Sequence, residues 1–253
     1  MEIGIIGAGN MGSAILKGIR DKGLFEKIRV YDTDNEKAGE YYADMETVAG
    51  SDVIVLAVKP NVLYLLIDQI RDFVPEGTIV VSVAAGQSAE KIEKAFAKKV
   101  KVVRVMPNTP LMVGEGMTAI APSFSAEDSD LAIVKSIFES AGRAEIVPES
   151  LMDAVTGVSG SSPAYVYMFI EALADAAVNA GLPRDKSYTF AAQSVLGAAK
   201  MVLETGKHPG ELKDNVCSPG GTTIEAVKVL EEKGLRGTVM EAVSACVEKS
   251  KKM

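Results

Sequence analysis

Apolar residues in the first half of the chain form short runs, each followed by a turn and then by apolar positions at helical spacing. Five such runs cover residues 2–6, 28–31, 52–58, 78–83 and 101–106. Nearly uninterrupted apolar runs are typical of parallel strands that are covered on both faces. Their alternation with helices on short connections predicts a parallel sheet with right-handed crossovers.

Polar residues mark the expected starts of the helices. Asn61 is expected to cap the helix that follows it, and Ser88 starts a short helix. Ser125 and Asp128 have capping-box spacing for a further helix. A weaker strand and a last strand are expected over residues 117–121 and 144–147.

No strand pattern follows Pro148, so we place the boundary there between a sheet domain over 1–148 and a helical domain over 149–253. Helices are expected over 164–180 and 184–204, and both are apolar on almost every side. A helix that is apolar all round must be enclosed all round. We therefore expect a second subunit to supply the missing surface; the alternative is a broad contact with the first domain.

Three glycines with the spacing Gly-X-Gly-X-X-Gly, Gly7, Gly9 and Gly12, stand between the first strand and the first helix. The first permits the turn, the second leaves room for a pyrophosphate, and the third lets the helix pack close to the strand. The unpaired N–H groups of that helix face the phosphates. Asp32 ends the second strand, where an acid can bond an adenosine ribose. The pattern favours a Rossmann-type dinucleotide site over a merely structural glycine turn.

Ligands of such a sheet lie beyond the carboxyl ends of its strands, so polar residues there are candidates for binding. Lys59 follows one strand and Asn108 follows another. Lys59 either donates to the cofactor or is a solvated lysine. Asn108 either orients a nicotinamide ring or holds its own loop.

A second candidate site is the segment Ser-Pro-Gly-Gly-Thr-Thr-Ile-Glu over residues 218–225, which opens a helix. Thr222 and Glu225 have capping-box spacing, which places Thr222 at the cap and Thr223 in the first turn. The glycines before the helix leave several backbone N–H groups without partners. Such a loop either binds a small anion, for instance a carboxylate, or is simply a well-capped helix start.

The composition of the 253 residues is that of an ordinary globular protein, with a net charge of −7 that argues against nucleic acid as a partner. Cys217 and Cys246 are too few for a disulfide framework, and no segment has the pattern of an export signal or a membrane span, so we expect a cytoplasmic protein. His208, which precedes a proline, is expected to cap a helix. The end of the chain from Lys249 is expected to be a solvated, frayed tail.

Five segments of the chain together resemble the pyrroline-5-carboxylate reductase family. They are Gly-Ala-Gly-Asn-Met-Gly at 7–12, Ala-Val-Lys-Pro at 57–60, Arg-Val-Met-Pro-Asn-Thr-Pro at 104–110, Gly-Val-Ser-Gly-Ser-Ser-Pro-Ala-Tyr at 157–165, and the segment 213–226, which contains Ser-Pro-Gly-Gly-Thr-Thr. The match covers nearly the whole chain. The last segment is the most specific, whereas many dehydrogenases share the glycine turn.

The resemblance implies the NAD(P)H-dependent reduction of L-1-pyrroline-5-carboxylate to L-proline, the last step of proline biosynthesis. It implies that the Ser218 hydroxyl and the N–H groups of Gly220, Gly221 and Thr222 hold the substrate carboxylate. Thr223 would then lie near the ring nitrogen as a proton donor or as a group that positions one. The family also forms dimers through interleaved C-terminal helices, in agreement with the all-round apolar helices.

The resulting expectation is an α/β protein with an N-terminal Rossmann-type doubly wound, mostly parallel sheet, followed by an all-α C-terminal dimerisation domain. The expected cofactor contacts are Gly7, Gly9, Asn10, Met11, Gly12, Asp32, Ala57, Lys59, Pro60 and Asn108. Asp32 departs from many family members, which place small or hydroxyl residues there and prefer NADPH. Because a carboxylate repels a 2′-phosphate, we expect NADH to be used at least as well as NADPH.

Two rival functions are a β-hydroxyacid dehydrogenase and a cofactor-binding sensor without chemistry. The dehydrogenases place a catalytic lysine on the first helix of the second domain, and residues 157–179 contain no lysine. A sensor would bind nucleotide without turnover, and it gives no reason for the loop at Ser218.

Overall fold

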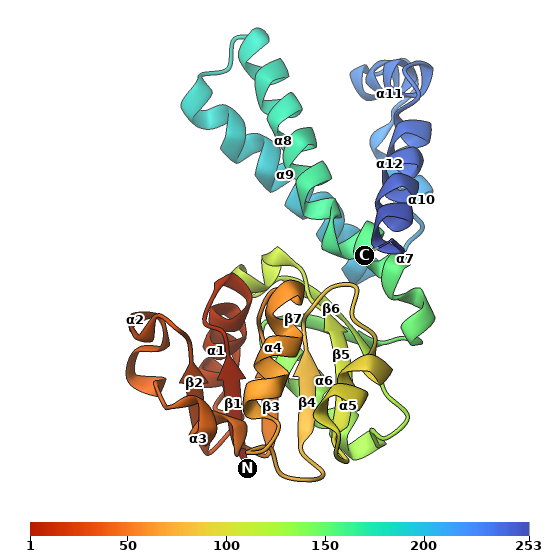
Figure 1. Cartoon of the computed structure of the whole chain (residues 1–253). Coiled ribbons are helices and arrows are strands. Elements are labelled where there is room, and N and C mark those ends of the chain that lie inside the picture. Colours follow the sequence, from red (N-terminus) through yellow and green to blue (C-terminus); the bar gives the residue numbers. More distant parts are fainter. Residues whose placement is uncertain (253) are drawn as a thin grey trace. The chain divides into compact units, whose positions relative to one another are not determined.

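The computed structural model describes residues 1–252 (Figure 1). Its contacts divide the chain into two compact units. The nucleotide unit comprises residues 1–161 together with the chain from Cys246 onward, and the helical unit comprises Ser162–Ala245.

The nucleotide unit contains one seven-stranded sheet with the strand order β2-β1-β3-β4-β5-β6-β7. The strands are β1 (Glu2–Ile6), β2 (Lys27–Tyr31), β3 (Val53–Leu56), β4 (Ile79–Ser82), β5 (Lys101–Met106), β6 (Gly116–Pro122) and β7 (Gly142–Ile146). All neighbours pair in parallel except β5 and β6, which are antiparallel. The predicted Rossmann-type, mostly parallel sheet is confirmed.

Helices cover both faces of this sheet. On one face α1 (Asn10–Lys22) and α6 (Asp128–Glu139) pack against the alternate strand residues that include Ile3, Val55 and Val103. On the other face α4 (Pro60–Ile70) and α5 (Ala89–Phe96) pack against the intervening residues. All four residues of β3 are fully buried, as expected of a strand covered on both faces.

Two predicted helix caps are wrong, each by two residues. Helix α4 begins at Pro60 with Lys59 as its N-cap, because the fixed φ of proline suits the first helical position, so Asn61 lies inside the helix. Helix α6 is capped by Glu127, which forms a capping box with Asp130. Ser125 does not cap it, because its hydroxyl instead bonds Glu93 and the carbonyl of Val100. The short helices α2 (Asn35–Ala38) and α3 (Met45–Ala49) connect β2 to β3.

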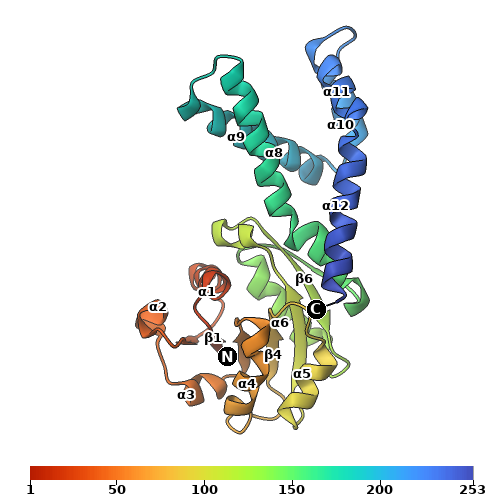
Figure 2. The same ribbon diagram turned by 45° about the horizontal axis from the view of Figure 1, so that its top comes forward.

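After β7 the nucleotide unit continues through the short helix α7 (Met152–Val155) and a π-helical turn at Thr156–Gly160. The end of the chain returns to this unit: the Ser250 hydroxyl donates a 2.6 Å hydrogen bond to Asp153, and Ser250 is buried. The views in Figures 1 and 2 both place the end of the last helix beside α7. The predicted frayed tail is therefore wrong for Ser250, because a specific hydrogen bond holds this residue.

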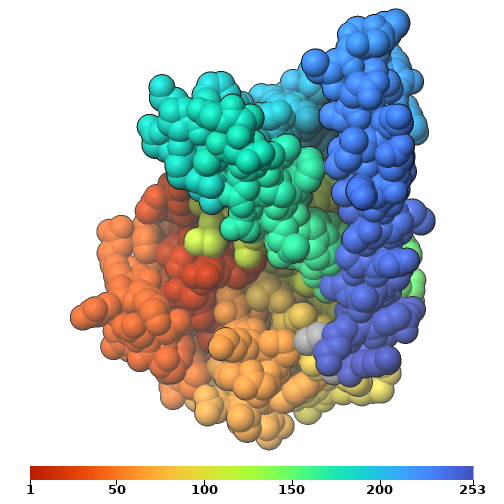
Figure 3. All heavy atoms as spheres, turned by 90° about the horizontal axis from the view of Figure 1, so that it is seen from above, coloured from red at the N-terminus to blue at the C-terminus, as the bar shows by residue number. Residues whose placement is uncertain are grey.

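The helical unit consists of α8 (Ser162–Asn179), α9 (Arg184–Thr205), α10 (Pro209–Val216), α11 (Thr222–Glu232) and the greater part of α12 (Leu235–Ser250). Helices α8 and α9 run side by side, and α9 follows Pro183 as predicted. In Figure 3, spheres of α8 and of α12 lie on the face of this unit that is turned toward the viewer. The predicted all-α character of this half is confirmed for the described residues.

Candidate functional site

The three glycines occupy the turn between β1 and α1, and each has a distinct environment. Gly7 has a φ of +103°, and a Cβ there would lie 2.5 Å from the carbonyl oxygen of Ala57. A Cβ on Gly12 would overlap the carbonyl oxygen of Gly7, so this glycine permits the close packing of helix and strand. A Cβ on Gly9 would meet nothing within 4 Å. The open space at Gly9 is where a bound phosphate can approach the backbone.

Helix α1 begins with Gly9 as its N-cap and has no side-chain hydrogen bond at the cap. Its first N–H groups are therefore left for a ligand, and the helix dipole favours an anion there. The Met11 side chain is partly buried and packs against the hydrophobic core. Asn10 lines a cavity of about 380 Å³ beside Lys17 and Lys37.

Asp32 is held by two backbone hydrogen bonds at the end of β2. One carboxylate oxygen accepts from the N–H of Ala8 at 2.7 Å and the other from the N–H of Asp34 at 2.9 Å. Partial burial raises the pKa of Asp32, but the hydrogen bonds from Asp34 and Ala8, with the charge of Lys37, outweigh it and lower the pKa overall. The carboxylate is therefore ionised at neutral pH, and each oxygen keeps a lone pair for a further donor.

A cavity of about 560 Å³ adjoins Asp32 and the glycine turn. Its lining includes Gly7, Gly9, Asp32, Ala57 and Lys59, which were all predicted from the sequence to contact a cofactor. Val62 and Leu65 of α4 also line it and are exposed, although no sequence pattern singled them out. Both residues are apolar yet lie outside the buried face of α4. Such exposed apolar side chains suit contact with a flat aromatic ring such as adenine, and this is the feature by which they could have been found.

Pro60 and Asn108 have structural roles in the fold. Pro60 is the first residue of α4. The Asn108 side chain accepts a 2.9 Å hydrogen bond from the N–H of Met117 and donates to the carbonyl oxygen of Ser159 at 3.3 Å. These bonds join the end of β5 to the π-helical turn, and they favour the loop-holding role for Asn108 of the two that the sequence left open.

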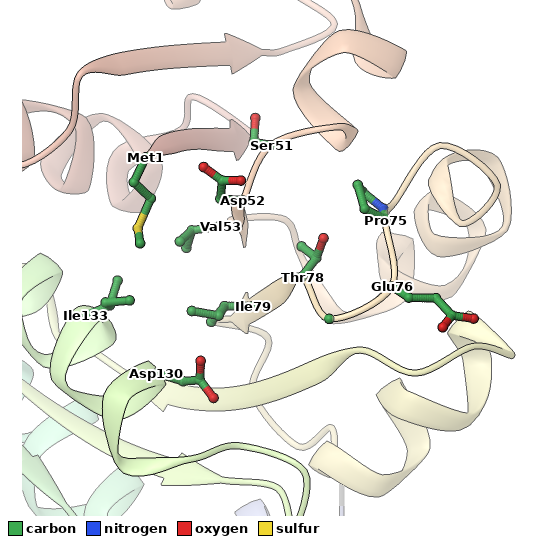
Figure 4. A pocket seen from close by; sticks show the side chains of 11 residues that line it. Met1, Ser51, Asp52, Val53, Pro75, Glu76, Thr78, Ile79, Asp130 and Ile133 are labelled. Carbon is green, nitrogen blue, oxygen red and sulfur yellow. The ribbon is translucent and has the colours of Figure 1, made fainter.

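Another cavity, of about 490 Å³, lies at the opposite edge of the sheet (Figure 4). Three carboxylates line it, those of Asp52, Glu76 and Asp130. Asp52 accepts from the N–H of Glu2 at 2.8 Å, and Asp130 pairs with Lys101 at 3.0 Å. This edge carries the amino ends of β3 and β4, whereas ligands of doubly wound sheets bind beyond the carboxyl ends. We therefore exclude it as the dinucleotide site.

The loop before α11 is the second candidate site. Gly220 has a φ of +67°, and the N–H of Gly221 donates to the carbonyl of Ser218 at 3.0 Å, which closes a tight turn. Gly221, not Thr222, is the N-cap of α11, and no side chain bonds the cap. The predicted capping box is wrong because the glycine supplies the extended backbone that begins the helix. The helix N–H groups are consequently left open to an anion.

Two threonines begin α11, and they differ in exposure: Thr222 is exposed, whereas Thr223 is half-buried. Ser218 is exposed, and its hydroxyl lies so close to Gly221 that a Cβ added to Gly221 would overlap it. His208 caps α10 as predicted, since its Nδ1 accepts from the N–H of Gly210 at 3.0 Å.

Comparison with known proteins identifies the family. The model of the pyrroline-5-carboxylate reductase dimerisation domain matches residues 149–253, and that of coenzyme F420-dependent NADP oxidoreductases matches residues 2–86. Pyrroline-5-carboxylate reductase from Escherichia coli is 48% identical over 100% of this chain and 98% of its own. The chain belongs to the pyrroline-5-carboxylate reductase family. The enzyme from Methanosarcina acetivorans is 43% identical over 100% of this chain and 97% of its own.

Solved structures of the family have the same fold. The reductase from Coxiella burnetii superposes with a TM-score of 0.93 at 34% identity, covering 99% of this chain and 97% of that one. The Plasmodium falciparum enzyme, solved with NADP bound, gives 0.90 at 36% identity, covering 100% and 97%. Membership of this family makes the protein an NAD(P)-dependent oxidoreductase, and its dimerisation domain makes it a homo-oligomer. None of these matches supports the β-hydroxyacid dehydrogenase alternative.

Among residues 1–252, no helix is both long enough and apolar enough to cross a membrane.

Proposed function

We propose that this protein reduces L-1-pyrroline-5-carboxylate to L-proline, the last step of proline biosynthesis. The observation that carries the proposal is 48% identity to the Escherichia coli reductase over the whole chain. The open, glycine-capped start of α11 supports it, because it suits a substrate that bears a carboxylate.

The cofactor contacts proposed are those of the glycine turn and the adjoining cavity. The pyrophosphate would lie on the N–H groups at the start of α1, next to the open position of Gly9. The adenosine would occupy the cavity between Asp32 and α4, with Lys59 at its rim. We keep Asn10, Met11, Gly12, Ala57, Pro60 and Asn108 as proposed members of this site.

NADH is proposed to serve at least as well as NADPH. Asp32 is ionised and lines the cavity proposed for the adenosine, and Asp34 follows two residues later. The nearby cation, Lys37, is already paired with Asp34 at 3.2 Å. A 2′-phosphate would therefore meet two carboxylates and a lysine whose charge is partly neutralised. A hydroxyl pair, in contrast, can donate to Asp32.

The substrate carboxylate is proposed to bind at the turn before α11. The proposed donors are the Ser218 hydroxyl and the backbone N–H groups of Gly220, Gly221 and Thr222, of which that of Gly221 also donates to the Ser218 carbonyl. Gly220 needs its left-handed backbone to form the turn, and Gly221 has no room for a side chain beside Ser218. The two glycines thus fix the direction of the N–H groups.

The reaction needs one hydride and one proton. The reduced nicotinamide supplies the hydride to the imine carbon, and the ring nitrogen gains the proton. Thr223, half-buried in the first turn of α11, is proposed to donate that proton or to hold the water that does. A modest donor suffices when the geometry is fixed.

Because the apolar faces of α8 and α9 need a partner, we propose a dimer through the C-terminal helices. The helical domain is proposed to begin at residue 149, and the substrate sites are proposed to lie near the dimer interface.

The first experiment is pyrroline-5-carboxylate-dependent oxidation of NADH and of NADPH by wild type, Thr223→Ala and Thr222→Ala. We expect Thr223→Ala to lower kcat by about tenfold to a hundredfold with an unchanged Kd for the cofactor. Thr222→Ala is the matched control, because its exposed side chain makes no cap hydrogen bond and its N–H is retained. Absence of turnover in the wild type would overturn the proposed reaction, and equal rates for the two variants would remove Thr223 from it.

Cofactor choice is tested with Asp32→Ser. We expect the ratio of kcat/KM for NADPH to that for NADH to rise about tenfold or more, equivalent to about 1.4 kcal/mol. A wild-type preference for NADPH above about tenfold would contradict the proposed role of Asp32.

A further inference from the structure

A polar cavity of about 240 Å³ lies in the nucleotide unit, apart from the dinucleotide cavity and the α11 loop. It is enclosed by the loop after β4 with the start of α5, by β5, by α7, and by the last turn of α12. The residues from these elements that face it include Gln87, Lys91, Arg104, Asp153 and Lys251. The return of the chain end, fixed by the bond between Ser250 and Asp153, completes its wall.

Arg104 gives this cavity a buried cation with unused donors. Its side chain is only 10% exposed, and among the described residues its one hydrogen-bond partner is Glu149, at 3.3 Å. None of its nitrogen atoms is both buried and unpartnered, so the remaining N–H groups are reached from the cavity. Glu149 is shared, because it also accepts from the N–H of Ala89 at 2.9 Å. A guanidinium with open N–H groups matches a planar oxyanion.

The rest of the lining adds further donors. The Gln87 side-chain oxygen accepts from the Tyr64 hydroxyl at 2.9 Å, which leaves its amide N–H₂ to donate. Lys91 has no ion pair among the described residues, whereas Lys251 pairs with Glu248 at 3.0 Å. Asp153 is the opposing charge in the wall, and Ser250 bonds one of its oxygens. Hydrogen-bond donors thus outnumber acceptors in the lining of this cavity, and one anionic group could accept from the donors that have no partner.

We propose that this cavity binds a small oxyanion, a carboxylate or a phosphate group of a metabolite, with Arg104 as the central contact. The proposal does not depend on the reaction at the α11 loop. The cavity adjoins Gly86 and Ser88, which follow the carboxyl end of β4.

Isothermal titration of the NADH-saturated protein tests the proposal, with succinate in one arm and inorganic phosphate in the other at constant ionic strength. Arg104→Lys keeps the charge but loses the planar fork, and we expect it to raise Kd about tenfold or more. Glu149→Gln keeps the shape and the acceptor oxygen shared by Ala89 and Arg104 but removes a negative charge that competes with the anion for the guanidinium, so it is expected to lower Kd several-fold. A saturable site for succinate alone identifies a carboxylate ligand, and one for phosphate alone identifies a phosphate.

The surface double variant Lys91→Gln/Lys251→Gln keeps the test decisive if Arg104→Lys fails to fold. We expect it to raise Kd a few-fold, because both ammonium groups lie at the rim of the site. Failure of both anions to give saturable binding would overturn the proposal. Equal affinity in the wild type and in all the variants that fold would also overturn it, since the anion would then bind elsewhere.

Discussion

The two units of this molecule differ in how far they bury their apolar side chains. The sheet of the nucleotide unit is covered on both faces, and Ile54, Val55 and Phe138 are fully buried within a single chain. In the helical unit, α8 buries only Ala174, while Met168 and Phe190 are 70% and 64% exposed. A layered sheet can close its own core, whereas a pair of helices that are apolar on all sides cannot. In the proposed dimer, the stability of the second unit would therefore depend on assembly.

The sharpest way to break this comparison is to place a charge on the exposed surface of each unit. We expect Phe190→Asp on α9 to abolish assembly and to lower activity by about a hundredfold, because an unpaired carboxylate cannot be buried in a subunit interface. Phe124→Asp is the matched control, since Phe124 is fully exposed in the nucleotide unit. Light scattering and turnover measure the two effects. A Phe190→Asp protein that still assembles would place the interface elsewhere.

The core of the nucleotide unit should be insensitive to assembly. We expect Phe138→Ala to lower the free energy of unfolding by about 3–5 kcal/mol, because it opens a cavity beneath the sheet. Phe124→Ala, at an exposed position, should cost less than about 0.5 kcal/mol. Urea unfolding at two protein concentrations is the measurement. A penalty for Phe138→Ala that changed with concentration would show that this core, too, depends on the partner subunit.

The sequence predicted features that depend on local patterns, and it did not predict features that depend on contacts between distant residues. The strands could be predicted because each is a short apolar run between turn residues, and the Gly-X-Gly-X-X-Gly turn was recognisable because each glycine answers a local steric demand. The hydrogen bond from Ser250 to Asp153 joins residues that are 97 positions apart, so no local sequence pattern predicts it. Helix starts were misplaced where a better local solution existed, as with Pro60 before Asn61.

For the candidate sites, residues at the ends of strands could be predicted from the sequence. Residues that other elements contribute to the same sites could not. Asp32 was identified from its place after β2. Val62 and Leu65 were missed because an apolar residue on the exposed side of a helix has no signal until the neighbouring cavity is known. The role of Arg104 likewise depends on Glu149, which is distant in sequence.

The glycine turn lies wholly in the unit that closes its own core, and a glycine pair tests whether fold and binding can be separated there. Gly9→Ala is expected to weaken NADH binding about tenfold or more while changing the free energy of unfolding by less than about 1 kcal/mol, because its Cβ meets only open space. Gly12→Ala should damage both, since its Cβ overlaps the carbonyl of Gly7. Fluorescence titration and thermal unfolding distinguish the two. Unchanged affinity in Gly9→Ala would move the pyrophosphate away from this turn.

The smallest expected effect is electrostatic and is also confined to the nucleotide unit. The pKa of Asp32 is lower in the folded protein than in the unfolded chain, where it is about 3.9, so its ionised form stabilises the fold. This stabilisation is complete above the unfolded pKa and disappears as the pH falls through the lowered folded value. The difference in unfolding free energy between wild type and Asp32→Asn should therefore stay constant from about pH 8 to pH 5 and shrink below about pH 4. A difference that grew on acidification would mean that burial, rather than the N–H groups of Ala8 and Asp34, governs this carboxylate.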